Sequence, residues 1–566
     1  MGNIKKQTFL HGALILLLAN LTVKIIGFIF RIPIYIILDD IGYANYNDAY
    51  ILYGLFFTIS TAGLPVAISR MISIANAKKN YAEEKKIFKI ALISFIAVGT
   101  LGTGIMILGA RFYCKYVITN NEAYYGILIL APTLFFVCIT SAFRGYFQGR
   151  QNMVPTAVSE IIEVLGKLFI GVAAAMYALN KYWPSRIYNE TTMKYETIMK
   201  HGSERLDIVA AFAISGLTVG VLGGSLFLFI RKLLMKNEYP DTYENYDIIM
   251  PVRKSRDIVQ EIIQISLPII LSSSIVSFSS MIDSAIMKRR LMDIGWLYES
   301  AKRAYGAYTG LAIPFFSFPA TLIAPIGVTI IPVIAAAFAE KNTGLIKSTV
   351  ESTFRVTSII AMPCAFGISC MSRPILNLYT IIKPELAESV ESTAPLLSVL
   401  AVAAVFVAMV HVTNSMLQSQ GQEIKTVISM ACGMVVKVVS SYILIGIPSV
   451  NRFGTPIGTC LCYLTIMGIN FYFLTKYTKI TPSVKLTFIK PFIASSVMAI
   501  SAILSYKIFN YILKSSHIAT LAAIIIAVVV YVFLILIQKT LTREDVLLLP
   551  KGAKIYETMK KKRLID

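Results

Sequence analysis

The stretch of sequence that decides the fold covers residues 9 to 38 and reads FLHGALILLLANLTVKIIGFIFRIPIYIIL. It is longer than the roughly 20 apolar residues that cross a bilayer as a helix, yet it contains two fixed cations, Lys24 and Arg31. A charged side chain at bilayer depth costs about 2.5–3.5 kcal/mol on insertion scales, so it normally faces a polar cavity, a partner or a substrate path.

Lys24 and Arg31 are separated by nearly two helical turns, which places both on one face of a helix, about 10 Å apart along its axis. Gly27 lies between them on the same face. We predict a cationic stripe beside a hollow that suits an anion. The alternative is that both cations pair with buried acids of a later apolar run, Glu160 or Glu163.

The rest of the chain repeats the pattern of long apolar runs. Of its 566 residues 56% are hydrophobic and 15% are charged, too little polar surface for a soluble protein of this length. We predict an all-α polytopic membrane protein with about fourteen transmembrane helices. The expected spans are 10–38, 48–74, 87–110, 124–146, 155–178, 208–230, 258–286, 305–338, 349–371, 390–417, 424–447, 456–477, 485–510 and 516–538.

The net charge of +22 could suggest nucleic acid, but in a membrane protein basic residues first report orientation. We therefore expect no nucleic-acid partner. Segment 39–47 has two acids and no Lys or Arg, whereas 78–89 carries five lysines and the tail 560–563 is wholly basic. Both termini are predicted to be cytoplasmic, in the plasma membrane. The expected outer segment 288–303 departs from the rule with five basic residues.

The chain also repeats itself. Segment 71–80 aligns with 333–342, and Pro155–Ser159 with Lys167 aligns with Lys425–Ser429 with Lys437. Internal repeats are typical of transporters that bind substrate between two halves and alternate access. We predict four parts in chain order: an N-terminal lobe of spans 1–6 (residues 1–240), a C-terminal lobe of spans 7–12 (241–480), spans 13 and 14 (481–540) and a basic cytoplasmic tail (541–566).

Further basic residues join the candidate set of substrate-binding residues. Lys167 and Lys437 lie mid-span at matching repeat positions, which favours a cavity or a pair between helices. Arg70, near the inner end of the second span, contacts substrate or only extends to the interface. Arg289 and Arg290 contact phosphate in the outer leaflet or form a solvated helix end.

No pattern points to an enzyme, a metal or a cofactor. The seven cysteines are scattered without a CxxC pair, and neither a phosphate-cradling loop nor a surface pair of catalytic acids is present. The acids Asp39 and Asp40 indicate an outer turn. A drug or cation antiporter would need cavity acids rather than buried bases, and a structural scaffold would have no reason to bury charge.

The stretch Ser141–Gly149, SAFRGYFQG, continues through Asn152-Met153 to Pro155–Ser159, and the first span contains Lys24–Pro33, KIIGFIFRIP. These motifs resemble those of the stage V sporulation protein B and YtgP proteins. That family consists of Gram-positive relatives of the MurJ lipid II flippases, in the multidrug/oligosaccharidyl-lipid/polysaccharide exporter superfamily.

The resemblance implies a flippase that moves an undecaprenyl-pyrophosphate-linked cell-wall precursor to the outer leaflet, with membrane lipids and the cell-wall synthesis machinery as partners. It implies that Lys24 takes the place of a MurJ arginine, and that Asp283 matches one acid of a sodium site, although span 424–447 lacks the second. Exporters of related lipid-linked polysaccharides and a role in sporulation stay open.

The first testable prediction concerns topology. Because the lysine-rich segment 78–89 is expected inside, a reporter fused after Asp566 should be active only when it is a type that works in the cytoplasm. Activity of a reporter that works only outside the membrane would contradict the predicted orientation.

Overall fold

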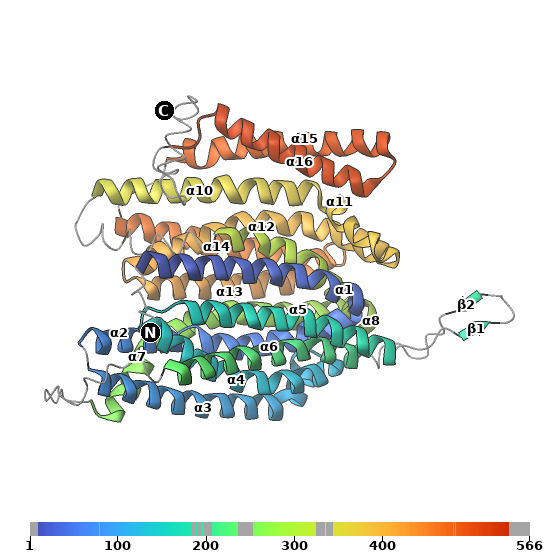
Figure 1. Cartoon of the computed structure of the whole chain (residues 1–566). Helices are drawn as coiled ribbons and strands as arrows, with labels where there is room; N and C mark the ends of the chain where they lie inside the picture. Colours follow the sequence, from blue (N-terminus) through green and yellow to red (C-terminus); the bar gives the residue numbers. More distant parts are fainter. Residues whose placement is uncertain are drawn as a thin grey trace. The chain divides into compact units, whose positions relative to one another are not determined.

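The computed structural model describes residues 9–78, 80–182, 187–189, 194–196, 206–235, 253–323, 334, 343–478, 480 and 483–542. In this part the chain is helical apart from one two-stranded hairpin, β1 (Ile187–Asn189) and β2 (Lys194–Glu196), which pair antiparallel with Tyr188 opposite Tyr195 (Figure 1). The segment 333–342 used in the repeat alignment, apart from Ile334, and most of the basic tail lie outside the described residues.

The helices follow the chain order of the predicted spans. They are α1 (Phe9–Thr61), α2 (Leu64–Ala77), α3 (Tyr81–Phe112), α4 (Tyr124–Gly149), α5 (Val154–Tyr182), α6 (Leu206–Leu234), α7 (Ser255–Asp293), α8 (Tyr298–Ala307), α10 (Thr343–Cys370), α11 (Ser372–Asn377), α12 (Ala387–Ser419), α13 (Glu423–Ile445), α14 (Gly454–Thr478), α15 (Lys490–Leu513) and α16 (Ser516–Ile537). Short 3₁₀ and π segments extend several of their ends.

Twelve helical segments of the described chain are long and apolar enough to cross a membrane. The first of them, Leu18–Asn76, contains two predicted spans, so the twelve account for thirteen of the fourteen. The remaining predicted span, 258–286, is also helical, within the serine-rich helix α7. The prediction of an all-helical, multi-pass membrane protein is confirmed.

Helix α1 contains the turn between the first two spans. Its backbone leaves helical geometry only at Asp39, with φ 59° and ψ −176°. The rings of Tyr35 and Tyr43 lie 5.4 Å apart, whereas eight residues of straight helix rise about 12 Å. The turn predicted at Asp39 and Asp40 is therefore present at Asp39, whereas residues 40–47, predicted to lie in a loop between the spans, are helical. Tyr35 donates a hydrogen bond to the buried Asp40, which holds the chain at this bend.

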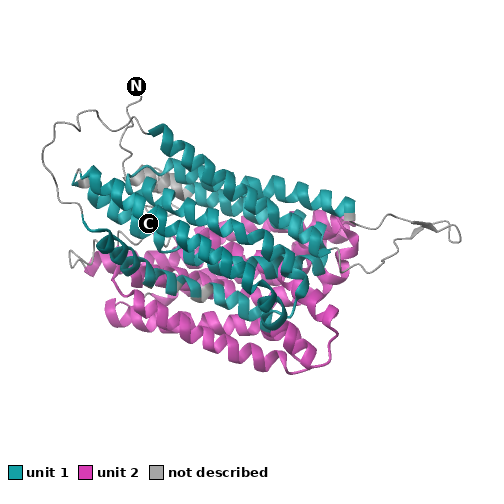
Figure 2. Cartoon of the chain, turned by 90° about the horizontal axis from the view of Figure 1, so that it is seen from below, with its two compact units in different colours: residues 1–285 teal, residues 286–566 magenta. Residues whose placement is uncertain are grey.

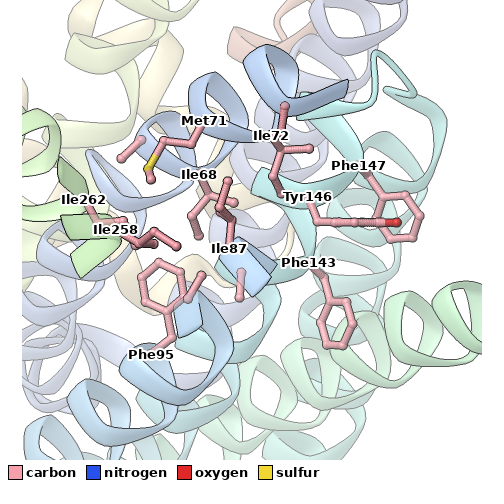
Figure 3. Close-up of a cluster of buried hydrophobic side chains, with 14 of the residues drawn as sticks. Ile68, Met71, Ile72, Ile87, Phe95, Phe143, Tyr146, Phe147, Ile258 and Ile262 are labelled. Carbon is pink, nitrogen blue, oxygen red and sulfur yellow. The ribbon is translucent and has the colours of Figure 1, made fainter. Parts of the chain in front are cut away.

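The chain divides into two compact units, residues 1–285 and 286–566 (Figure 2). The division falls inside α7, and the lobe boundary predicted at residue 240 stays a prediction. Within unit 1, Ile258 and Ile262 of α7 join a buried cluster with residues of α2, α3 and α4 (Figure 3). Farther along α7, Ser284 donates to the buried Asp48 of α1 at 2.5 Å.

The closest helix pair of unit 1 is α5 with α6. Gly216 and Gly220 follow each other at four-residue spacing on α6, which puts both on one face. A Cβ atom at Gly220 would lie 2.5 Å from the backbone oxygen of Glu163, and one at Gly216 would lie under 3.0 Å from the backbone of Gly171. Small residues let backbones approach in membranes, where packing rather than hydrophobicity holds helices together.

Unit 2 contains a corresponding close pair, α13 with α14. The C-terminal helices α15 and α16 pack against each other, and α15 packs on α10. The Tyr531 hydroxyl of α16 donates to the Ile359 carbonyl of α10 at 2.7 Å, and Lys490 of α15 donates to the Gln538 carbonyl at 2.6 Å. The first bond attaches α16 to α10, and the second joins the start of α15 to the end of α16.

The second testable prediction follows from the approach of the glycines on α6 to α5. Gly216→Val should force α5 and α6 apart, because the clash is with backbone and no rotamer relieves it. Overpacking costs about 1–3 kcal/mol or more, so the detergent-solubilised variant should lose its monodisperse peak at a clearly lower temperature than the wild type. The matched control is Gly104→Val on α3, where nothing lies within 4 Å of an added Cβ. Equal losses in both variants would contradict the packing argument.

Candidate functional site

The first half of α1 presents the two cations as the sequence predicts. Lys24 is exposed, Arg31 is half-buried, and a Cβ atom added at Gly27 between them would meet nothing within 4 Å. Within the described chain, neither Lys24 nor Arg31 forms an ion pair with a carboxylate. Unit 1 thus contains two cations on a candidate membrane span, with open space at Gly27 between them.

The acids considered as partners for these cations bind another residue. On α5, Glu163 Oε1 lies 2.8 Å from Nη2 of Arg144, and Glu160 Oε1 lies 4.0 Å from Nη1 of the same guanidinium. Arg144 comes from the last turns of α4, in the SAFRGYFQG motif, and also donates from Nε to Ser159 at 3.1 Å. Arg144 therefore forms an ion pair between helices α4 and α5.

Arg31 faces a row of aromatic rings on the second half of α1. Tyr43, Tyr46, Tyr50, Tyr53 and Phe57 follow one another along this helix with ring centroids 5.6, 6.0, 5.9 and 5.7 Å apart. Arg31 is close enough to act electrostatically on the first three tyrosines. The bend at Asp39 produces this arrangement by folding the tyrosines back toward Arg31.

Lys167 of α5 reaches the same row of rings. Its Nζ atom lies 4.5 Å from the ring centroid of Tyr50 and 4.9 Å from that of Phe30, within the range in which an aromatic face attracts a cation. Arg31 and Lys167, far apart in sequence, therefore meet at Tyr50. We call Arg31, Lys167, Phe30, Tyr43, Tyr46 and Tyr50 the cation–aromatic cluster.

The other candidates lie elsewhere. Arg70 is exposed on α2, and Asp283 is half-buried on α7 next to Ser284. In unit 2, Lys437 is buried in α13, whereas Arg289 is exposed at the end of α7.

Arg290 of unit 2 has structural contacts. It pairs with Asp293 at 2.9 Å, donates to the Tyr442 carbonyl at 3.2 Å, and its guanidinium lies 4.2 Å from the Tyr442 ring centroid. These contacts fix the end of α7 against α13.

Sequence reasoning missed two buried lysines of unit 2. Lys288 and Lys302 are almost fully buried, with Lys288 Nζ 4.9 Å from the ring centroid of Tyr305 and Lys302 Nζ 5.8 Å from that of Tyr298. Their alternation with tyrosines in 288–305 was the signal that could have found them. Together with the contacts of Arg290, this burial accounts for much of the basic excess in segment 288–303.

Two family models match the chain. A model described as "Polysaccharide biosynthesis protein" covers residues 9–193, and one described as "MatE" covers residues 268–443. The chain belongs to the multidrug/oligosaccharidyl-lipid/polysaccharide exporter superfamily of transporters. The two matches fall one in each predicted lobe, and neither family is enzymatic, as the sequence predicts.

Comparisons with individual proteins also find members of this superfamily. Lipid II flippase MurJ of Bacillus subtilis (strain 168) is 24% identical over 83% of this chain and 82% of its own. Stage V sporulation protein B of the same organism is 24% identical over 62% of each chain. A solved structure of lipid II flippase MurJ in an inward closed conformation superposes with a TM-score of 0.62 at 13% identity, over 91% of this chain and 97% of that one. The superposition confirms the fold.

No group of three or more His, Cys, Asp or Glu side chains in the described residues is arranged to hold a metal ion. The candidate site in unit 1 is the cation–aromatic cluster, in which cations lie beside aromatic rings. Such a surface can bind an anion without transferring a group to it.

The third testable prediction compares Lys24, which forms no ion pair in the described chain, with Arg144, which is paired with two acids. Lys24→Gln should leave the amount of folded protein in the membrane unchanged, because no acid loses a partner. Arg144→Gln should lower it, because removing one partner of a buried pair costs about 3–5 kcal/mol. Quantifying membrane protein after mild detergent extraction tests both. Loss of Lys24→Gln protein, restored by a second change Glu160→Gln, would show instead that Lys24 has an acidic partner.

Proposed function

We propose that this transporter is a flippase for an undecaprenyl-pyrophosphate-linked cell-wall precursor similar to lipid II, moved from the cytoplasmic to the outer leaflet by alternating access. The observation that carries the proposal is the cation–aromatic cluster, in which Arg31 and Lys167 lie beside aromatic rings and form no ion pair with a carboxylate of the described residues. The similarity to lipid II flippase MurJ supports the same substrate class.

The chemistry of a pyrophosphate suits this cluster. Its charge is the main barrier to crossing hydrocarbon, and nearby cations lower that barrier most where the dielectric constant is low. Arginine offers a planar fork for two phosphate oxygens, whereas lysine offers a compact point charge on a flexible stem. Arg31 would orient the pyrophosphate, and Lys24 and Lys167 would add attraction on either side of it.

The aromatic faces have a separate role in this proposal. By holding Lys167 through its ring contacts with Phe30 and Tyr50, the cluster keeps an ammonium group in place without neutralising it. A carboxylate in the same position would compete with the substrate for the cation. The remaining sequence candidates, Arg70, Arg289, Arg290 and Lys437, are proposed as secondary contacts along the path, and Asp283 as a coupling residue.

Two further points complete the proposal. The protein would reside in the plasma membrane of a Gram-positive bacterium with both termini inside, and would work beside the cell-wall synthesis machinery, in growth or sporulation. A second candidate is export of another lipid-linked polysaccharide unit, which the description of the model matching residues 9–193 favours. Drug or cation antiport fits the surplus of cations less well.

The fourth testable prediction concerns transport. In cells depleted of their own lipid II flippase, expression of this chain should restore lipid II accessibility at the outer face, and Arg31→Ala or Lys24→Ala should abolish it. Removing one partner of a buried, charge-assisted hydrogen bond costs about 2–5 kcal/mol, so export should fall at least about tenfold.

Two controls make the transport result decisive. Lys24→Arg keeps the charge and should retain most activity, whereas Lys24→Gln, similar in length but neutral, should lose it. Protein levels measured in the same membranes exclude loss through misfolding. Normal export by both alanine variants would refute the proposal, and rescue of polysaccharide export without lipid II export would favour the second candidate.

A further inference from the structure

The ion pair between α4 and α5 has an uneven charge. The guanidinium of Arg144 forms ion pairs with two carboxylates, Glu163 at 2.8 Å and Glu160 at 4.0 Å. Two carboxylates beside one cation in a membrane leave a net negative charge, which is costly at low dielectric. One proton on either carboxylate makes the group neutral.

The geometry distinguishes the two acids. Glu163 has the direct contact with Arg144, whereas Glu160 is farther away and its Oε2 atom is buried without a hydrogen-bond partner. The Glu160 side chain is still 19% exposed, so protons can reach it. Glu160 is therefore the carboxylate free to take up a proton.

Other oxygens around the group also lack partners. The hydroxyl of Tyr53, a side chain only 2% exposed, has no hydrogen-bond partner, and it acts electrostatically with Glu163 and Arg144. Thr140, one turn before Arg144, and Thr156, one turn before Glu160, have equally buried and unpartnered hydroxyls. Buried hydroxyls are almost always hydrogen-bonded, commonly to water. Water bound at the two threonine hydroxyls would lie on the same helices as the ion pair.

The second repeat supports a functional reason for the charge. At the 270-residue offset of the aligned motifs, Arg144 corresponds to Asn414 and Ser159 to Ser429. In unit 2, Asn470 of α14 donates to Asn414 at 2.8 Å and accepts from Ser429 at 2.5 Å, forming a buried neutral network. Helices in this position can therefore be joined without ions, so packing alone does not explain the charged version in unit 1.

The groups that face Glu160 and Glu163 come from each neighbouring helix. Helix α4 contributes Arg144, and α1 contributes Tyr53. Helix α6 presents Gly220 and Gly224, which have no charge. On α5 itself, Lys167 directs its ammonium to Phe30 and Tyr50, away from the acids. Among the described residues, Arg144 is therefore the one cation that forms ion pairs with the two acids.

We propose that Arg144, Glu160 and Glu163 form a proton-binding site, in which Glu160 takes up and releases one proton as the transporter changes conformation. The proton comes from water on the inner side, forms an O–H bond on a Glu160 oxygen, and returns to water when the carboxylate ionises. No electron is transferred. The coupling role rests on the proposed flippase function, but the site itself does not.

The test is infrared difference spectroscopy of the purified full-length protein without lipid substrate, comparing about pH 6 with about pH 8. Exposed carboxylates titrate near pH 4, so they stay ionised throughout. The wild type should gain the carbonyl stretch of one protonated carboxyl group at the lower pH. Glu160→Gln should lose this signal, and so should Glu163→Gln, because a single acid then pairs with Arg144.

Three controls keep the result interpretable. Glu391→Gln, at an exposed ion pair of unit 2, should retain the signal, and Glu160→Asp, which keeps the acid, should retain it even if Glu160→Gln folds poorly. Replacing choline chloride by sodium chloride should not change it. A signal that persists in Glu160→Gln, or that depends on sodium rather than pH, would overturn the proposal. Loss of lipid II export with the signal intact would refute only the flippase function.

Discussion

The close approach of α5 to α6 is the constraint on which the arrangement of unit 1 depends. Gly220 leaves room for the backbone of Glu163, and a Cβ atom at Gly224 would lie 3.1 Å from the carboxylate oxygen of Glu163. With one face of α5 fixed against α6, Glu163 and Lys167 are directed to α4 and α1. The contact is made of backbone, so it sets the register of every charged group on α5.

The charges on α5 and α1 are handled in two physically different ways. Near the start of α5, Arg144 meets two acids, Glu160 and Glu163, which together exceed its charge by one. Farther along, Lys167 lies over the rings of Phe30 and Tyr50, which attract the ammonium without cancelling its charge. The flippase function proposed above would need the second arrangement, because a cation that is already paired with a carboxylate is less available to an anionic substrate.

Much of the fold could be predicted from the sequence, because hydrocarbon demands long apolar helices and these are visible as runs. The turn at Asp39 could be predicted from its two acids, but the immediate return to helix after it could not, because the tight bend depends on the hydrogen bond from Tyr35 to Asp40. The ion pair of Glu163 with Arg144 could not be predicted either, because the sequence does not show which cation packs against a given acid. The helical spacing of the tyrosines after Asp39 is visible in the sequence. Their proximity to Arg31 is not, because it depends on the bend at Asp39.

Residues at matching positions of the two repeats differ in their surroundings. Lys167 and Lys437 occupy matching positions, yet Lys167 lies half-buried over Tyr50, whereas Lys437 is 3% exposed within α13. The motifs around Ser159 and Ser429 likewise keep the serine while the partner changes from Arg144 to an asparagine network. A shared backbone plan thus preserves the positions of side chains along the helices, but not their burial or their partners. It follows that repeat symmetry predicts the location of a site in this protein, while its chemistry must be established separately in each unit.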